Sequence, residues 1–121
     1  MYSLSTDNTG NKLIIVFKGN FELQEAEQLY AELQKNVPKL KKGFSVFMDL
    51  TFLERMETNA RLFIEKAMDL FNKNGVSKVI RIIPDPTKDI GFNIMSLFHY
   101  SDGVDIHTYK SYQEAERPHN C

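Results

Sequence analysis

The stretch from Phe44 to Phe71 reads FSVFMDLTFLERMETNARLFIEKAMDLF and contains both kinds of element on which the fold depends. It opens with an apolar run that predicts a buried strand over Phe44–Leu50. From Ala60 onward the apolar residues recur at helical spacing, which predicts a helix over about Thr58–Lys73. The polar residues Glu54–Asn59 are therefore expected to form a corner between strand and helix. Open α/β folds usually place functional side chains at such corners, beyond the carboxyl ends of the strands.

Strands and helices alternate on both sides of this stretch. The other strands are expected over Tyr2–Thr6, Lys12–Lys18, Lys78–Ile83 and Val104–Tyr109. The other helices are expected over Phe21–Asn36, Asp89–Tyr100 and, as a short turn capped by Ser111, Ser111–Glu116. Asn20 is expected to cap the first helix, and Asn74-Gly75 to end the second. The alternation predicts an α/β fold with a single mixed, mainly parallel β-sheet of four to five strands and three to four helices.

The composition is that of an ordinary globular protein. The chain has 121 residues, of which 42% are apolar and 26% charged, and is expected to form one domain over residues 1–121 with a frayed tail from Arg117. A net charge of −1 without a concentrated basic face argues against general nucleic-acid or membrane-surface binding. No apolar run approaches the roughly 20 residues that span a bilayer. The absence of a signal peptide pattern and the single cysteine, Cys121, predict a reduced cytoplasmic protein.

No recognised catalytic or metal-binding motif occurs in the sequence. His99, His107 and His119 do not have metal-ligand spacing with one another or with acidic residues. A Gly-rich phosphate loop, a catalytic triad and a paired-carboxylate signature are also missing from the pattern. We therefore expect a binding protein without a metal or cofactor. An enzyme whose site is assembled from residues distant in the sequence stays open as an alternative.

Several short stretches resemble the STAS domains, a family named for sulfate transporters and anti-sigma-factor antagonists. The resemblance covers about residues 12–116, and its best marks are Phe17–Phe21, Asp49–Thr51, Leu97–Val104 and Ser111–Ala115. It implies a STAS-like fold and a bacterial regulator that acts by binding. The implied partner is an anti-sigma factor or a serine/threonine kinase-like protein, with ATP bound by that partner.

The resemblance also implies a phosphoacceptor. STAS antagonists have an Asp-Ser-Ser-Gly corner before the second helix, and its first serine is phosphorylated. Aligned without gaps, this corner falls on Glu57-Thr58-Asn59-Ala60. These residues are chemically similar to those of the motif but not identical to them. Thr58 is thereby the candidate phosphoacceptor. The alternative interpretation is that Thr58 only caps its helix.

The residues expected to contact the partner are Asp49, Glu54, Arg55, Glu57, Thr58 and Asn59. Each has a structural alternative. Charged side chains at a corner are often only solvated, and Asp49 at a strand end can hold loop amides by hydrogen bonds.

Two further possibilities come from the apolar residues. The expected helix Asp89–Tyr100 is rich in Phe and Met, which suits core packing but also a sticky face for a partner or a homodimer, and Gly91 would allow a close approach. The nine Phe and five Met residues of the chain are also compatible with a ligand- or lipid-sensing module that has an apolar pocket between sheet and helices.

Overall fold

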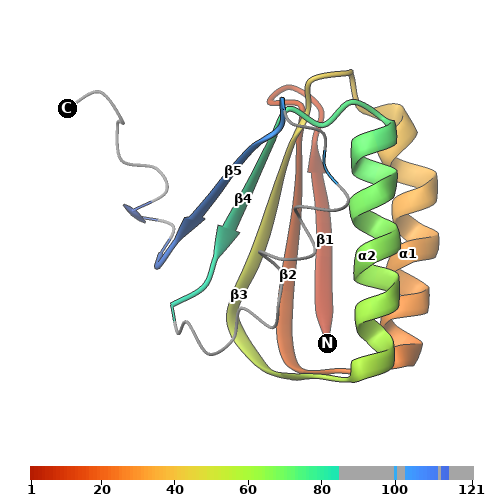
Figure 1. Ribbon diagram of the computed structural model, residues 1–121, viewed down its shortest axis with the longest axis vertical. Coiled ribbons are helices and arrows are strands. Elements are labelled where there is room, and N and C mark those ends of the chain that lie inside the picture. Colours follow the sequence, from red (N-terminus) through yellow and green to blue (C-terminus); the bar gives the residue numbers. More distant parts are fainter. Residues whose placement is uncertain (85–99, 101–102, 112, 115–121) are drawn as a thin grey trace.

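The computed structural model describes residues 1–84, 100, 103–111 and 113–114. Two helices lie side by side on one face of a mixed sheet (Figure 1). The five strands are β1 (Tyr2–Asp7), β2 (Lys12–Phe21), β3 (Ser45–Met56), β4 (Lys78–Ile82) and β5 (Asp105–Tyr109), and they lie in the sheet in chain order. The helices are α1 (Leu23–Asn36), which is followed by a 3-10 turn at Val37–Lys39, and α2 (Thr58–Lys73).

The pairing of the strands confirms the predicted fold class. β1 runs antiparallel to β2, and the pairs β2–β3, β3–β4 and β4–β5 are all parallel. The sheet is thus mixed and mainly parallel, as expected from the alternation of elements. None of the helices in the described residues is long and apolar enough to span a membrane.

Alternate residues of the central strands form the core against the helices. In β2, Leu13, Ile15 and Phe17 are fully buried, because successive side chains of a strand point to opposite faces. The helices contribute the residues that recur at helical spacing, which are Ala26, Leu29 and Leu33 from α1 and Ala60, Ile64, Ala67, Met68 and Phe71 from α2. This arrangement leaves the starts of both helices at the carboxyl edge of the parallel strands (Figure 1).

β2 and β3 are longer than the sequence pattern predicted. Their pairing continues beyond the end of β4, from Lys18 opposite Phe52 to Phe21 opposite Met56. Gly19 adopts the left-handed region at φ 58°, and the register of the ladder shifts beside it. The glycine therefore bends the strand and does not end it, since a bulge accommodates this conformation at little cost.

The longer β2 also moves the start of α1. The helix begins at Leu23 with Glu22 as its N-cap residue, so the expected cap at Asn20 is wrong. Asn20 lies within β2, opposite Arg55 of β3.

Other expected boundaries are confirmed. α2 spans Thr58–Lys73, Asn74 is its C-cap residue, and Gly75 follows with φ 88°. The side-chain oxygen of Ser111 accepts a hydrogen bond from the Glu114 amide at 3.1 Å, as expected of a cap. The expected helix Asp89–Tyr100, apart from Tyr100, and the tail Arg117–Cys121 lie outside the described residues.

Candidate functional site

The corner between β3 and α2 is a strand end joined directly to a helix. β3 continues through Glu54 and Arg55 to Met56, so these residues do not form the expected loop. Glu54 and Arg55 are exposed, whereas the Met56 side chain is buried and anchors the strand end in the core. Glu57 is the only residue between the strand and the first helical residue, Thr58.

Glu57 ties together the starts of both helices. Its side-chain Oε2 accepts a hydrogen bond from the Leu23 amide, the first residue of α1, at 2.9 Å. Its own amide donates to the Phe21 carbonyl at 3.0 Å, and its carbonyl accepts from the Ala60 amide at 3.0 Å. A carboxylate is favourable beside a helix N-terminus because of the unpaired N–H groups and the helix dipole. Glu57 therefore has a structural role at the corner, whatever it contacts on a partner.

Thr58 and Asn59 occupy the first positions of α2, and both are exposed. Glu57 is the N-cap residue, so the interpretation of Thr58 as the cap is wrong. The first turn of α2 contains no acidic residue. Negative charge added at Thr58 would therefore lie at the positive end of a helix whose own first turn does not compensate the dipole.

Asp49 lies apart from the exposed corner. It is buried within β3, with 3% of its surface exposed, in register with Val16 of β2 and Ile82 of β4. Its Oδ1 accepts hydrogen bonds from the amide and the hydroxyl of Thr51, at 2.9 and 2.5 Å. The expected alternative, that Asp49 holds nearby backbone by hydrogen bonds, matches this geometry.

The end of β2 adds residues to the corner that the sequence pattern did not suggest. Asn20, Phe21 and Glu22 line a small notch of about 110 Å³ together with Arg55 and Glu57. These residues come together because β2 and β3 extend as a pair to the same level. The sequence pattern predicted that β2 ends at Lys18, so it gave no indication that these residues lie together.

Two large apolar side chains near the corner are also exposed. Phe52 in β3 is 61% exposed, and Leu62 in α2 is 57% exposed. Single exposed apolar residues are common on protein surfaces, but aromatic residues beside a polar corner are typical anchors of protein interfaces.

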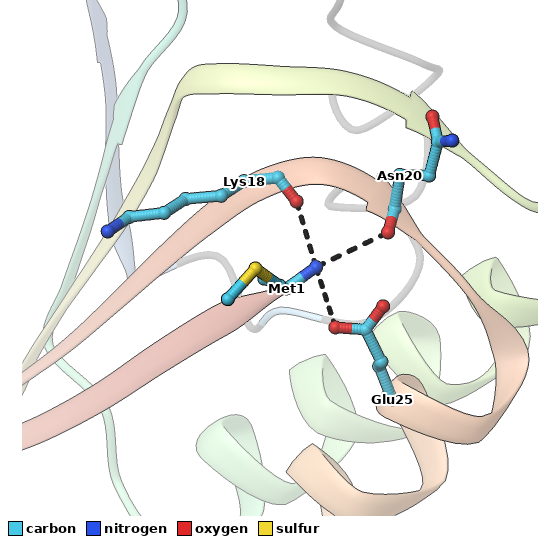
Figure 2. A network of polar contacts seen from close by, with 4 residues as sticks. All are labelled: Met1, Lys18, Asn20 and Glu25. Carbon is cyan, nitrogen blue, oxygen red and sulfur yellow. Dashed lines mark hydrogen bonds and ion pairs between the residues drawn. The ribbon is translucent and has the colours of Figure 1, made fainter.

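The start of β1 is anchored beside the same edge (Figure 2). The ammonium group of Met1 donates to the carbonyl oxygens of Lys18, at 2.9 Å, and Asn20, at 3.3 Å. It also forms an ion pair with the Glu25 carboxylate at 2.6 Å. Figure 2 shows these contacts joining β1, β2 and the first turns of α1.

Several of the abundant Phe and Met residues pack in the core. Phe17, Phe21, Phe44, Phe71 and Met48 are all essentially inaccessible to solvent, and Phe17 and Phe21 meet edge to face at 4.9 Å between ring centroids. The composition that allowed an apolar ligand pocket is thus explained to a large extent by core packing. Among the described residues no group of three or more His, Cys, Asp and Glu side chains could hold a metal ion.

Neither a protein-family model nor a curated protein sequence matches the chain. Solved structures match its fold. The unphosphorylated anti-sigma factor antagonist SpoIIAA gives a TM-score of 0.67 at 16% identity, covering 95% of this chain and 94% of that one. SpoIIAA in its phosphorylated form, a Bacillus cell fate determinant, gives 0.66 at 16% identity, covering 97% and 98%.

A third structure is a DUF3478 family protein from Shewanella loihica with a SpoIIAA-like fold. It gives a TM-score of 0.72 at 13% identity, covering 94% of this chain and 90% of that one. The chain therefore has the SpoIIAA-like fold, and the resemblance to STAS domains is confirmed at the level of the fold.

Proposed function

We propose that this chain is a non-enzymatic, cytoplasmic regulatory domain that binds a partner protein through the corner Glu54–Asn59 and the start of α2. The observation that carries the proposal is the hydrogen-bonded geometry of this corner. Glu57 is hydrogen-bonded to the starts of both helices, while Glu54, Arg55, Thr58 and Asn59 are exposed around it. A preorganised surface loses little conformational entropy on binding, which favours a recognition role.

The partner is an anti-sigma factor or a serine/threonine kinase-like protein. This assignment is supported by the fold shared with SpoIIAA, an anti-sigma factor antagonist. The exposed Arg55 and Glu54 offer both signs of charge for recognition at the corner, and the nearby exposed Phe52 offers an apolar contact. Asp49 acts from within the strand by holding Thr51.

Phosphorylation of Thr58 regulates the binding. SpoIIAA, with the same fold, exists in a phosphorylated form. A phosphate on Thr58 adds about −1.5 to −2 charges beside Glu54 and Glu57. The free N–H groups of the first turn of α2 stabilise the modified state, while the added charge repels an acidic partner surface and so abolishes docking.

The test begins with capture of the full chain and its partners from its source cells, followed by mass spectrometry of the partners and of Thr58. Binding of the purified partner is then compared for the Thr58→Ala and Thr58→Glu variants. We expect Thr58→Ala to bind like the unmodified chain and Thr58→Glu to bind at least about tenfold more weakly.

A matched control is Thr9→Glu, which adds the same charge to an exposed threonine. Thr9 lies in the turn between β1 and β2, at the end of the strands opposite to the corner (Figure 1). It should leave binding unchanged. Equal binding by Thr58→Glu and Thr58→Ala would reject the switch, and Arg55→Ala with full affinity would reject the corner as the docking surface.

A further inference from the structure

The edge strand β1 has backbone N–H and C=O groups that point away from β2, in the plane of the sheet. Among the described residues, β1 is paired with β2 alone. The Lys18 amide donates to the Met1 carbonyl at 2.7 Å and the Met1 nitrogen donates to the Lys18 carbonyl at 2.9 Å, so these two residues form a hydrogen-bonded pair. Such pairs alternate with non-bonded pairs in an antiparallel ladder. In this register, Tyr2, Leu4 and Thr6 therefore direct their N–H and C=O groups outward.

Within the part of the chain that the structure describes, the strand lacks the usual protection of an edge. Natural sheets blunt their edges with proline, lysine, a bulge or a covering segment, because an open edge pairs readily with another chain. β1 reads Tyr-Ser-Leu-Ser-Thr-Asp and contains neither proline nor lysine. Its six residues pair with β2 without a register shift. The outer edge is thus regular enough to accept another strand.

A groove of about 450 Å³ runs between this edge and α1. Tyr2, Leu4 and Thr6 line it from the strand, and Glu25, Gln28 and Glu32 line it from the helix. The Tyr2 hydroxyl donates a hydrogen bond to Glu32 Oε2 at 2.6 Å, and burial together with this carboxylate raises the pKa of Tyr2. The Tyr2 hydroxyl therefore keeps its proton and stays a donor to Glu32.

The helix that forms one wall of the groove is acidic. α1 contains Glu25, Glu27 and Glu32, and its only basic residue is Lys35 in the last turn. The groove contains the carboxylates of Glu25 and Glu32, whereas Glu27 lies outside its lining. The ammonium group of Met1 pairs with Glu25, which leaves the charge of Glu32 for an incoming ligand. This wall is therefore complementary to a basic segment.

We propose that this groove binds an extended, basic segment of a partner protein, which adds to β1 as a further strand. The backbone of the segment pairs with Tyr2, Leu4 and Thr6. Its residues opposite these three point to the same face of the sheet, and so toward α1. Lysine or arginine at alternate positions then meets the acidic wall. This surface is distinct from the corner, and the proposal does not depend on the function proposed above.

The test is a selection of random peptides of about nine residues, displayed on phage, against the full chain. We expect the enriched peptides to carry lysine or arginine at alternate positions. A synthetic copy of the best peptide should slow hydrogen exchange of the Tyr2, Leu4 and Thr6 amides. Those of Ser3 and Ser5 should change less, because they already face β2.

Three variants separate the contributions of charge and backbone. Gln28 is exposed in the groove, so Gln28→Lys should weaken the peptide about five-fold at low salt and Gln28→Glu should strengthen it by a similar factor, with both effects shrinking at high salt. Thr6→Pro removes an outward N–H without breaking a bond to β2, and should also weaken binding.

Failure to enrich any peptide, enrichment without alternate basic residues, or binding that is indifferent to both Gln28→Lys and Thr6→Pro would overturn the proposal. So would a dimer in sedimentation analysis that Thr6→Pro dissociates, because a second copy of the chain would then occupy the edge. Circular dichroism of each variant confirms that the fold is retained.

Discussion

The Glu57 carboxylate accepts a hydrogen bond from the Leu23 amide across 34 positions of the chain. This contact joins the first residue of α1 to the side chain of Glu57, which occupies the N-cap position of α2. The two helix starts are therefore not independent, and a change at Glu57 affects both.

Substitution of Glu57 should lower the stability of the fold. Side-chain acceptors at a helix start contribute about 0.5–2 kcal/mol, so Glu57→Ala should reduce the free energy of unfolding by about 1–2 kcal/mol. Glu57→Gln retains an acceptor and should lose less. The measurement is urea unfolding followed by circular dichroism. Glu54→Ala removes an exposed carboxylate three residues earlier and serves as the control, with little expected change. Equal losses for Glu57→Ala and Glu54→Ala would contradict the capping role.

Asp49 should matter for stability because its buried carboxylate satisfies two donors of Thr51. Asp49→Ala leaves the Thr51 amide and hydroxyl without this acceptor, and we expect a loss of about 2–3 kcal/mol in the free energy of unfolding. Asp49→Asn keeps an oxygen in place and should be milder. Denaturant midpoints of the two variants give the comparison. If Asp49→Ala unfolds at the same midpoint as the unmodified chain, the assigned role is wrong.

Gly19 should resist replacement by alanine. Its φ of 58° lies in the left-handed region, while nothing within 4 Å would meet an added Cβ, so the cost is one of backbone conformation alone. We expect Gly19→Ala to destabilise by about 1–2 kcal/mol and Gly19→Asn by less, because asparagine tolerates this region. Gly103→Ala is a matched control, since Gly103 also has open space around it but no positive φ. The measurement is the thermal unfolding of the three variants. Equal losses of stability for Gly19→Ala and Gly103→Ala would contradict the conformational cost assigned to Gly19.

Tyr100 should make stability sensitive to alkaline pH. Burial raises its pKa, and Asp69 adds to this effect, while Arg81 acts in the opposite direction. The unfolded chain loses this proton near pH 10.0, but the folded chain retains it. Stability is thus fully present below this pH and falls as the pH rises above it.

The Tyr100→Phe variant should therefore lose less stability above pH 10 than the unmodified chain. At neutral pH it should be unchanged or more stable by up to about 1 kcal/mol, because the buried hydroxyl has no hydrogen-bond partner in the described part of the chain. Tyr2→Phe is the comparison, since the pKa of Tyr2 is also raised. Unfolding curves at several pH values decide the matter, and a marked loss of stability for Tyr100→Phe at neutral pH would count against this account.

The sequence predicted α2 with the bounds that the structure shows. Its apolar residues recur regularly, and Asn74-Gly75 ends the helix with a left-handed residue, so both signals are local. The alternation of elements likewise predicted the mixed sheet. These features depend on neighbours in the chain, which a single sequence displays.

The features of the structure that the sequence did not predict depend on contacts between segments distant in the chain. Gly19 has the local character of a strand breaker, and only the pairing of Asn20 with Arg55 reveals that the strand continues. The bond from the Leu23 amide to Glu57 has no side-chain signature at Leu23. Thr58 is the first residue of α2, as the predicted bounds of the helix had it, and the N-cap position therefore falls on Glu57.

The consecutive order of the strands also bears on how the chain acquires its fold during synthesis. Each strand pairs with the one that precedes it in the chain, so the sheet can grow in one direction as the polypeptide leaves the ribosome. β1, β2 and β3 can pair before β4 and β5 exist, because β1 pairs with β2 and β2 pairs with β3. The parallel pairs β2–β3 and β3–β4 close longer loops than the β1–β2 hairpin, because a helix lies between the paired strands, so the hairpin is expected to form first. The nascent chain would then expose a growing edge of the sheet in addition to the outer edge of β1.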